Sequence, residues 1–326
     1  MSTGQTIGFI GIGSMGWPMA ANLMSGGRRV VVNDLSRERV QGFCKEHRAA
    51  AAASNTELAR QSDIVILMLP SSAADEQALS GSQGVLPGLR QQALVIDMTS
   101  GNPAKTTEFA RKVSEAGATL IDAPVSGGVP RARTGDLSIM VGGEPDVFAR
   151  AEPVLKCMGS SIIRCGGVGT AHAMKALNNL MSAAGYLSGI EALLIGKKLG
   201  LDPATMVDIL NVSTGVNGST QRKFKQMVLT RKFDSGFGLD LMVKDLTIAM
   251  EIAKDGGTPA PFAGLCREMW AAAQQMLGPG HDHTEMVLLS ERSPTPNSEA
   301  MRSRTDATCH EGTSSRAEAH RPGVIS

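Results

Sequence analysis

The sequence predicts an α/β fold in two parts: a domain built on a doubly wound parallel sheet, and an all-helical domain joined to it by a long helix. Short apolar runs alternate with helical stretches through the first half of the chain, and a glycine-rich turn follows the first run. After residue 166 the apolar residues recur only at helical spacing. A chain of 326 residues with 42% hydrophobic content is long enough for two cores.

The predicted strands share apolar residues at consecutive positions, which is typical of strands buried on both faces. They cover residues 7–10, 30–32, 64–69, 93–96, 119–121, 137–141 and 161–164. Helix signals lie between them. Asn102 is a predicted N-cap with Pro103 at the first helical position, and Gly26 with Gly27 ends the first helix. This alternation predicts parallel strand pairing.

The second half of the chain predicts helices over residues 168–199, 239–253 and 261–276. Gly200 ends the long helix, and Asp202 with Pro203 begins a further helix. The apolar residues expected on one side of that helix are Met206, Ile209 and Leu210.

These patterns divide the chain into three regions. We place the sheet domain at residues 1–166 and the helical domain, expected to bind substrate and to mediate oligomerisation, at residues 167–292. Residues 293–326 are rich in Ser, Thr, Arg, Glu, Pro and Ala, which predicts a disordered tail.

Charge and cysteine content narrow the class of protein. The net charge is +1, with 32 basic and 31 acidic residues, so no overall field favours nucleic acid or an anionic membrane, and a small-molecule partner is expected. The five cysteines have no C-x-x-C spacing, which indicates reduced thiols in a cytoplasmic protein. No targeting pattern or apolar run of about 18 residues predicts a membrane segment.

The glycine turn predicts a dinucleotide site. Gly11, Gly13 and Gly16 fit G-x-G-x-x-G between a strand and a helix, so the whole turn, with Ile12, Ser14 and Met15, is expected to hold a pyrophosphate, as in Rossmann domains. Asp34 follows roughly 20 residues later, where a carboxylate accepts hydrogen bonds from the adenosine ribose. A carboxylate there favours NAD, and nearby Arg37 leaves NADP open.

Three further stretches fall at the carboxyl ends of predicted strands, where ligands lie in open α/β sheets. Leu69 with Pro70, and Thr99, are predicted cofactor contacts, whereas Ser71 and Ser100 are as well explained as helix caps. Ser126, Gly127 and Gly128 form a loop whose backbone N–H groups and hydroxyl suit a carboxylate. A turn that needs glycine geometry is the equal alternative for this loop.

Lys175 is the predicted proton-transfer group. Lys175 and Asn179 stand four residues apart in a predicted helix and share one face, so an amine lies beside an amide. Interconversion of alcohol and carbonyl with a nicotinamide needs such a proton carrier, whose pKa falls on burial or beside a second cation such as Lys244. The alternatives are a solvated Lys175 and a surface ion pair at Lys244.

Other polar residues receive smaller roles. His172 is interpreted as packed or solvated, with a minor role at most. The run His281-Asp282-His283 lacks a further ligand at metal-binding spacing, so an exposed turn is expected and no metal site is predicted. Arg131 and Arg133 follow the glycine loop, as solvated charges or as residues that tune substrate choice.

With these residues, the chain resembles the 3-hydroxyisobutyrate dehydrogenase family of β-hydroxyacid dehydrogenases over about residues 5–290. Four stretches carry the resemblance: GIGSMGWPMAANL from Gly11, DAPVSGG from Asp122, GVGTAHAMKALNN from Gly167, and KDL from Lys244. The resemblance implies that Lys175 is catalytic and that Asn179 and the Ser126-Gly127-Gly128 loop hold substrate. It also implies that Thr99 and Lys244 contact the cofactor, and that subunits form homodimers or homotetramers.

The resemblance leaves the substrate open. A short 3-hydroxy acid such as 3-hydroxyisobutyrate, or its semialdehyde, is expected, and reduction of tartronate semialdehyde, glyoxylate or succinic semialdehyde is the alternative. The similar 6-phosphogluconate dehydrogenases continue differently after the lysine, and imine reductases lack it. A non-catalytic dinucleotide-sensing protein is the alternative from another class. Residues 129–133 and the chain after residue 289 depart from the family pattern.

Overall fold

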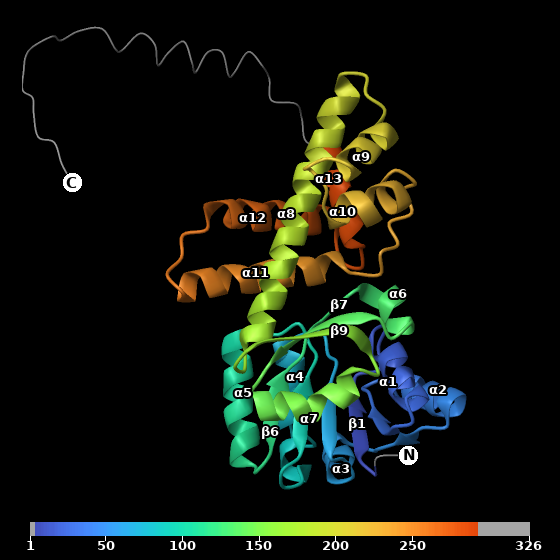
Figure 1. The fold of residues 1–326 in the computed structure, drawn as a ribbon, viewed down its shortest axis with the longest axis vertical. Coiled ribbons are helices and arrows are strands. Elements are labelled where there is room, and N and C mark those ends of the chain that lie inside the picture. The colour runs from blue at the N-terminus through green and yellow to red at the C-terminus, as the bar shows by residue number, and fades with distance from the viewer. Residues whose placement is uncertain (1–3, 293–326) are drawn as a thin grey trace, which may run out of the picture.

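The computed structural model describes residues 4–292, and the predicted disorder of residues 293–326 lies outside them. Figure 1 shows two domains with a long helix running from one into the other. The elements of the first domain are β1 (Thr6–Ile10), α1 (Gly16–Ser25), β2 (Arg29–Asn33), α2 (Arg37–His47), β3 (Ala50–Ala51), α3 (Asn55–Arg60), β4 (Ile64–Leu67), α4 (Ser72–Ser80), the 3₁₀ turn η1 (Leu86–Gly88), β5 (Leu94–Asp97), α5 (Pro103–Glu115), β6 (Thr119–Asp122), β7 (Val125–Ser126), α6 (Gly128–Arg133), β8 (Leu137–Gly142), α7 (Pro145–Leu155) and β9 (Gly159–Gly166).

The sheet has the strand order β3-β2-β1-β4-β5-β6-β8-β7, and β9 pairs with β8. Strands β1 to β6 are parallel, and the chain crosses over between β1 and β4. The predicted doubly wound sheet is therefore confirmed for this part. Because parallel strands end at one edge, the loops after β1, β2, β4 and β5 meet there.

The far part of the sheet differs from the parallel pairing that the sequence predicts. β8 runs antiparallel to both β6 and β7. After β6 the chain reverses through the two-residue strand β7 and the short helix α6, so no crossover helix returns it to a parallel start. Strands as short as β3 and β7 carry no recognisable apolar run, and the prediction therefore misses both.

Strand burial explains the apolar runs. Every residue of β4 and β5 is buried, and so is every residue of β1. Successive side chains enter different cores: Ile64 and Ile66 pack in one, Val65 and Leu67 in the other. The sheet is thus covered by apolar side chains on both faces, as the consecutive apolar runs predict.

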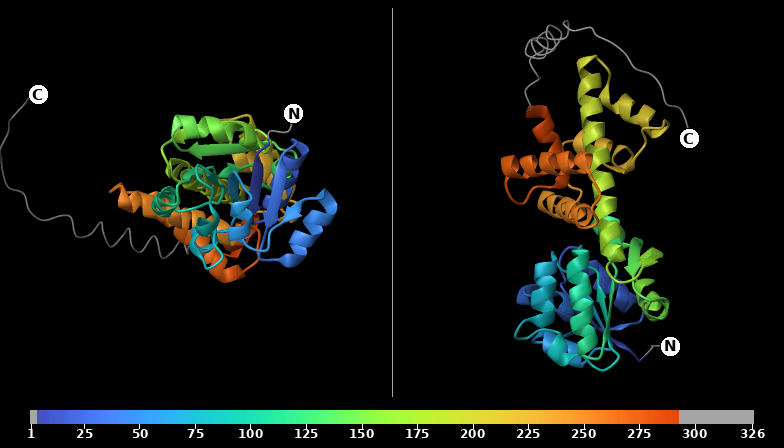
Figure 2. Two further views of the ribbon diagram at one scale, coloured as in Figure 1. Left: turned by 90° about the horizontal axis from the view of Figure 1, so that it is seen from below. Right: turned by 90° about the vertical axis from the view of Figure 1, so that its left-hand side faces the viewer.

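The second domain is helical, as predicted. Its elements are α8 (Thr170–Lys198), α9 (Pro203–Asn211), α10 (Gly218–Arg222), the π-helical turn η2 (Phe224–Val228), α11 (Leu239–Asp255), α12 (Pro261–Leu277), the 3₁₀ turn η3 (His283–Met286) and α13 (Val287–Arg292). Helices α11 and α12 pack against α8, and the core between them contains Tyr186 and Trp270. Figure 2 shows α8 leaving the sheet domain and crossing the whole helical domain.

One predicted helix face is wrong. In α9 the side chain buried in the core is Val207, and Ile209 is exposed. Val207 and Ile209 are two residues apart, so about 200° of rotation places them on opposite sides of the helix. Packing against α8 selects the Val207 side, with Met206 packed beside it.

Two contacts fix α8 and the helical domain against the sheet. Asp122, the last residue of β6, accepts hydrogen bonds from the backbone N–H groups of Gly169 at 2.7 Å and of His172 at 2.9 Å. A carboxylate is favourable at the start of a helix, where N–H groups lack partners. Farther along, the Asn102 amide donates to Glu251 on α11 at 2.7 Å.

Two negative findings concern the described residues alone. Of the five cysteines, Cys309 lies outside residues 4–292, and the four inside are free thiols. Within the same range, no helix combines the length and the apolar character needed to cross a membrane.

Candidate active site

The glycine turn after β1 has the geometry that a dinucleotide needs. Gly11 has φ +93, and a Cβ there would lie 2.4 Å from the Met68 carbonyl oxygen. A Cβ on Gly16 would lie 1.9 Å from the Gly11 carbonyl oxygen, whereas one on Gly13 would meet no atom within 4 Å. The first and third glycines therefore close the turn, and the second leaves open space for a ligand to approach the backbone. No side chain caps α1. Trp17 donates its N–H to the Gly13 carbonyl at 2.9 Å, and Pro18 has no N–H. The N–H groups of Ser14, Met15 and Gly16, in contrast, have no partner among residues 4–292 and remain available to an anion.

Asp34 follows β2 and is held beside this turn. One carboxylate oxygen accepts from the Ile12 N–H at 2.9 Å, and the other accepts from the Ser36 N–H at 2.8 Å. The Arg39 guanidinium lies 3.4 Å from Asp34 Oδ1. Asp34 also lines a cavity of about 610 Å³ between the β2 end and the α3 and α4 segments. The turn, the carboxylate and this cavity fit the phosphate, ribose and base of a dinucleotide.

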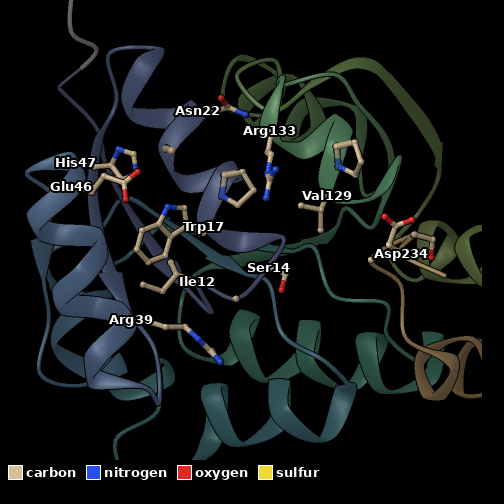
Figure 3. A pocket seen from close by; sticks show the side chains of 16 residues that line it. Ile12, Ser14, Trp17, Asn22, Arg39, Glu46, His47, Val129, Arg133 and Asp234 are labelled. Carbon is tan, nitrogen blue, oxygen red and sulfur yellow. The ribbon is translucent and has the colours of Figure 1, made fainter. Parts of the chain in front are cut away.

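A second cavity, of about 900 Å³, opens at the same turn and reaches the helical domain. Figure 3 shows Ser14 on one side of it, Arg133 from α6 above, and Asp234 from the helical domain at the far end. Arg133 is thus placed at a cavity that both domains line. Arg131 is bound instead to Asp136, with its Nε 3.0 Å from the carboxylate.

The ends of β4 and β5 are tied together by Thr99. Its side chain is fully buried, and its hydroxyl donates to Asp75 at 2.8 Å and accepts from the Leu69 N–H at 3.1 Å. The hydroxyl therefore holds the Leu69-Pro70 loop in place and does not face the site. Ser71 caps α4, as expected, whereas α5 is capped by Asn102, as predicted, and not by Ser100.

The loop after β7 is a positive-φ turn. Gly127 has φ +134 and Gly128 has φ +67, in a region that L side chains avoid. A Cβ on Gly127 would also lie 2.9 Å from Arg131 Cβ. The turn needs glycine for its own geometry, and it leaves Ser126 at the end of β7, next to the start of α6.

Lys175 lies at the centre of a buried polar cluster. Its side chain is 7% exposed, and Nζ donates to Asn179 Oδ1 at 3.4 Å. The Asn179 amide donates in turn to Asp245 on α11 at 2.5 Å, and the Asn178 amide donates to Asn179 Oδ1 at 3.1 Å. The predicted pairing of amine and amide on one helix face is therefore present, and Asp245 fixes how the amide is turned.

Burial lowers the pKa of the Lys175 amine below its usual value. The negative charge of Asp245 opposes this effect, and the positive charge of Lys244 adds to it. The environment therefore brings the amine closer to the range in which it can both accept and release a proton.

Lys244 reaches across the domain junction. Its Nζ donates to the backbone carbonyls of Ser100 at 2.6 Å and of Pro70 at 3.1 Å, and lies 3.3 Å from Asp245 Oδ1. A surface ion pair does not describe this arrangement, because the amine binds the loops at the carboxyl edge of the sheet. Lys244 joins the helical domain to the edge where the cofactor turn lies.

Sequence reasoning missed two acids of the site. Asp245 orients Asn179, and its signal is an acidic residue on the apolar side of α11, between Met242 and Ala249, which are both buried. Asp122 anchors the start of α8, and its signal is a carboxylate at the end of a buried strand. Both positions cost free energy unless the carboxylate finds partners, and this is a reason to expect a role.

The histidines lie outside the proton-transfer cluster. His172 is buried, its Nδ1 is 2.6 Å from the Thr106 hydroxyl, and burial lowers its pKa to about 3, so it stays neutral. The exposed turn expected at residues 281–283 is wrong: Asp282 caps η3, and His283 is buried beside Tyr186 and Trp270. Residues 4–292 contain no cluster of three or more His, Cys, Asp or Glu that could hold a metal ion.

Comparison with known proteins gives the chain its family. Residues 6–167 match the NAD binding domain of 6-phosphogluconate dehydrogenase, and residues 169–290 match the NAD-binding domain of NADP-dependent 3-hydroxyisobutyrate dehydrogenase. The human mitochondrial 3-hydroxyisobutyrate dehydrogenase is 38% identical over 273 residues, which are 81% of this chain and 80% of that protein. The chain belongs to the 3-hydroxyisobutyrate dehydrogenase family.

Two further relatives agree with this assignment. The 2-(hydroxymethyl)glutarate dehydrogenase of Eubacterium barkeri is 36% identical over 86% of this chain and 93% of its own length. The 3-hydroxyisobutyrate dehydrogenase of Mycobacterium tuberculosis, solved with L-serine, matches with a TM-score of 0.81 and 30% identity over 89% of this chain and 99% of its own. This dehydrogenase is thus an NAD(P)-dependent oxidoreductase of hydroxy acids.

Alanine substitutions at Gly13 and Gly16 of this dehydrogenase should have different effects. Gly13→Ala places a methyl group in the open space, so we expect a folded protein with NADH affinity lowered about 10-fold or more. Gly16→Ala pushes a methyl group into the Gly11 carbonyl, so we expect a lower melting temperature as well. NADH fluorescence titration and thermal unfolding measure the two effects. Unchanged NADH binding in Gly13→Ala would contradict the placement of the pyrophosphate.

Proposed function

We propose that this dehydrogenase oxidises the primary alcohol of a short 3-hydroxy acid to a semialdehyde with NAD, and that Lys175 is the general base, or the general acid in the reverse direction. The observation that supports this is the Lys175 amine itself. It is buried where the helical domain meets the carboxyl edge of the sheet, and it is bound to an amide that a carboxylate holds in place.

The proposed oxidation consists of a hydride transfer and a proton transfer. Bound NAD would supply the acceptor for the hydride that leaves the carbinol carbon. The neutral Lys175 amine takes the hydroxyl proton and becomes an ammonium, so that the products are semialdehyde, NADH and a protonated lysine. In reduction the ammonium returns its proton to the oxygen. Burial supports both directions because it makes the neutral form of Lys175 accessible.

The proposed substrate clamp has two parts. Ser126, Gly127 and Gly128 supply a hydroxyl and backbone N–H groups for the substrate carboxylate. Asn179 lies within hydrogen-bonding distance of the Lys175 amine and orients the alcohol oxygen toward it. In the same proposal the cofactor is held by the turn from Gly11 to Gly16 and by Asp34, Leu69, Pro70 and Lys244. Thr99 acts by holding the Leu69 loop in place.

The substrate class follows from the chemistry shared by the relatives. 3-Hydroxyisobutyrate and 2-(hydroxymethyl)glutarate, from which those relatives are named, both carry a hydroxymethyl group on the carbon next to a carboxylate. We therefore propose a substrate with this unit. Reduction of tartronate semialdehyde, glyoxylate or succinic semialdehyde is the alternative within the same chemistry.

The remaining proposals concern cofactor preference and organisation. Asp34 disfavours a 2′-phosphate, so we propose NAD before NADP. Residues 1–166 then bind the cofactor, and residues 167–292 bind substrate and mediate assembly. The odd number of cysteines supports a cytoplasmic location.

The assembly proposal rests on exposed apolar side chains of α8. They recur at helical spacing, at Met174, Leu177 and Met181. We propose that a second copy of the chain covers them.

The central prediction concerns Lys175. Lys175→Ala removes the proton carrier, and we expect kcat to fall roughly 10²- to 10⁴-fold while NADH still binds. NADH absorbance with 3-hydroxyisobutyrate measures turnover, and fluorescence titration measures cofactor affinity. The exposed Lys197 on the same helix provides the control, since Lys197→Ala should retain activity. Full activity in Lys175→Ala would remove this residue from the mechanism, and cofactor binding without turnover of any hydroxy acid would favour the sensor alternative.

The structure predicts the direction in which Asp245→Asn shifts the pH dependence of kcat/KM. Because Asp245 raises the pKa of Lys175, Asp245→Asn lowers that pKa further below its usual value. Alcohol oxidation needs the neutral amine, so kcat/KM rises as pH rises through this pKa, and the rising limb should move to lower pH in the variant. Asp240→Asn, at an exposed position of the same helix, should leave the limb in place. A shift to higher pH, or none, would contradict the assignment.

The assembly proposal predicts a change in mass. Met181→Glu places a charge on the exposed stripe of α8, where Met181 is 74% exposed, and should shift the protein toward monomer in size-exclusion chromatography with light scattering. Leu35→Glu makes the same change at a fully exposed position of the sheet domain and should leave the mass unaltered. A wild-type monomer at micromolar concentration would refute the proposal.

A further inference from the structure

A second amine, that of Lys223, lies on the same side of α8 as the proton-transfer cluster. Its Nζ donates to the Ser182 hydroxyl at 3.3 Å and lies 5.9 Å from the centre of the Tyr186 ring. Lys175, Asn179, Ser182 and Tyr186 are spaced four, three and four residues apart, so their side chains form one stripe along α8. Lys223 reaches this stripe from the segment between α10 and η2.

Lys223 is half-buried and has no counter-ion within hydrogen-bonding distance among residues 4–292. An ammonium group has three donors, and the Ser182 hydroxyl is its one hydrogen-bond acceptor among residues 4–292. Lys225, two residues later, pairs instead with Asp208 at 2.6 Å. Asp282 is the acid that acts on Lys223 through its charge, yet its own oxygens are bound by Ser235 and by the start of η3.

Lys223 carries a positive charge at neutral pH. Burial, with the charges of Arg222 and Lys175, lowers the pKa of Lys223 to about 8 against the opposing effect of Asp282. Below that value most of the group is protonated. A partly desolvated cation that has one hydrogen-bond acceptor and no carboxylate partner in the described part of the chain is suited to bind a separate anion.

The spacing along α8 matches a small ligand. The Lys175 amine is bound at Asn179 and the Lys223 amine at Ser182, and these two residues are about 4.5 Å apart along the helix axis. In a 3-hydroxy acid, a carboxyethyl group on the central carbon extends about 4 Å from that carbon to its carboxyl carbon. The axial separation of the two residues that bind the amines is therefore close to the distance between the central carbon and the additional carboxyl carbon of such an acid.

We propose that Lys223, with Ser182, binds a second carboxylate of the substrate, and that the preferred substrate is a dicarboxylic 3-hydroxy acid whose additional carboxylate lies on the C2 substituent. This inference rests on the proposed function, because it uses the same site and the same alcohol chemistry. Lys175 then transfers the proton, the Ser126-Gly127-Gly128 loop holds the first carboxylate, and Lys223 determines which C2 substituent is accepted.

Two acids form a matched pair of probes. 3-Hydroxyisobutyrate has a methyl group on C2, and 2-(hydroxymethyl)glutarate has a carboxyethyl group there, while the alcohol and first carboxylate are the same. We expect the full-length wild-type protein with NAD to favour the dicarboxylate in kcat/KM. In Lys223→Met the ratio of the two kcat/KM values should fall about 10- to 100-fold, mainly through KM for the dicarboxylate.

Two variants separate charge from folding. Lys223→Arg keeps the charge and should preserve most of the preference, and Lys225→Met makes the same change two residues away and should preserve all of it. If 3-hydroxyisobutyrate is oxidised and the ratio does not respond to Lys223→Met, the assignment of Lys223 is overturned and the proposed function stands.

Binding of unreactive acids gives an answer that does not need turnover. 2-Methylglutarate and isobutyrate lack the hydroxyl group, and calorimetry with the NAD-loaded protein measures their affinities. We expect 2-methylglutarate to bind about 10-fold tighter or more, and this advantage to disappear in Lys223→Met. Equal affinities in the wild type overturn the inference about Lys223. Failure of both hydroxy acids to react would overturn the proposed function separately.

Discussion

Taking the Lys175 amine out of water is the constraint around which the rest of the site is organised. An isolated buried ammonium is costly, and the chain offsets this cost with a short line of partners, Asn179 and then Asp245. Asp245 comes from a different helix, so the cluster forms only when α11 packs on α8. The groups that lower the free energy of the buried amine thus also fix its position.

Contacts between the two domains also fix the position of the Lys175 amine. Asp122 holds the start of α8 against the end of β6, so the first turns of the helix have a fixed distance from the sheet. Lys244 binds the carbonyls of Pro70 and Ser100 from the other side, at the loops that end β4 and β5. Charged groups that bind backbone atoms therefore connect the chemistry of the helical domain to the cofactor edge of the sheet.

The sequence was a sound guide wherever the signal was local. Consecutive apolar residues identified buried strands such as β1 and β4, Asn102 with Pro103 identified the start of α5, and the four-residue spacing placed Lys175 beside Asn179. It did not reveal that the buried Thr99 hydroxyl binds Asp75 and the Leu69 N–H, or that β8 is antiparallel to β6. Both depend on partners distant in sequence, which no periodicity reports.

The sequence by itself determined the fold class, the glycine turn and the presence of an amine and an amide on one helix face, because each follows from residue order and the period of a strand or helix. Only the tertiary structure decided that this amine is buried and that Asp245 orients its partner. Tertiary packing also decided that Lys244 crosses to the sheet edge and that Lys223 reaches the stripe on α8 with no counter-ion among residues 4–292. Burial and charge pairing depend on which elements pack together, and that is a property of the folded chain.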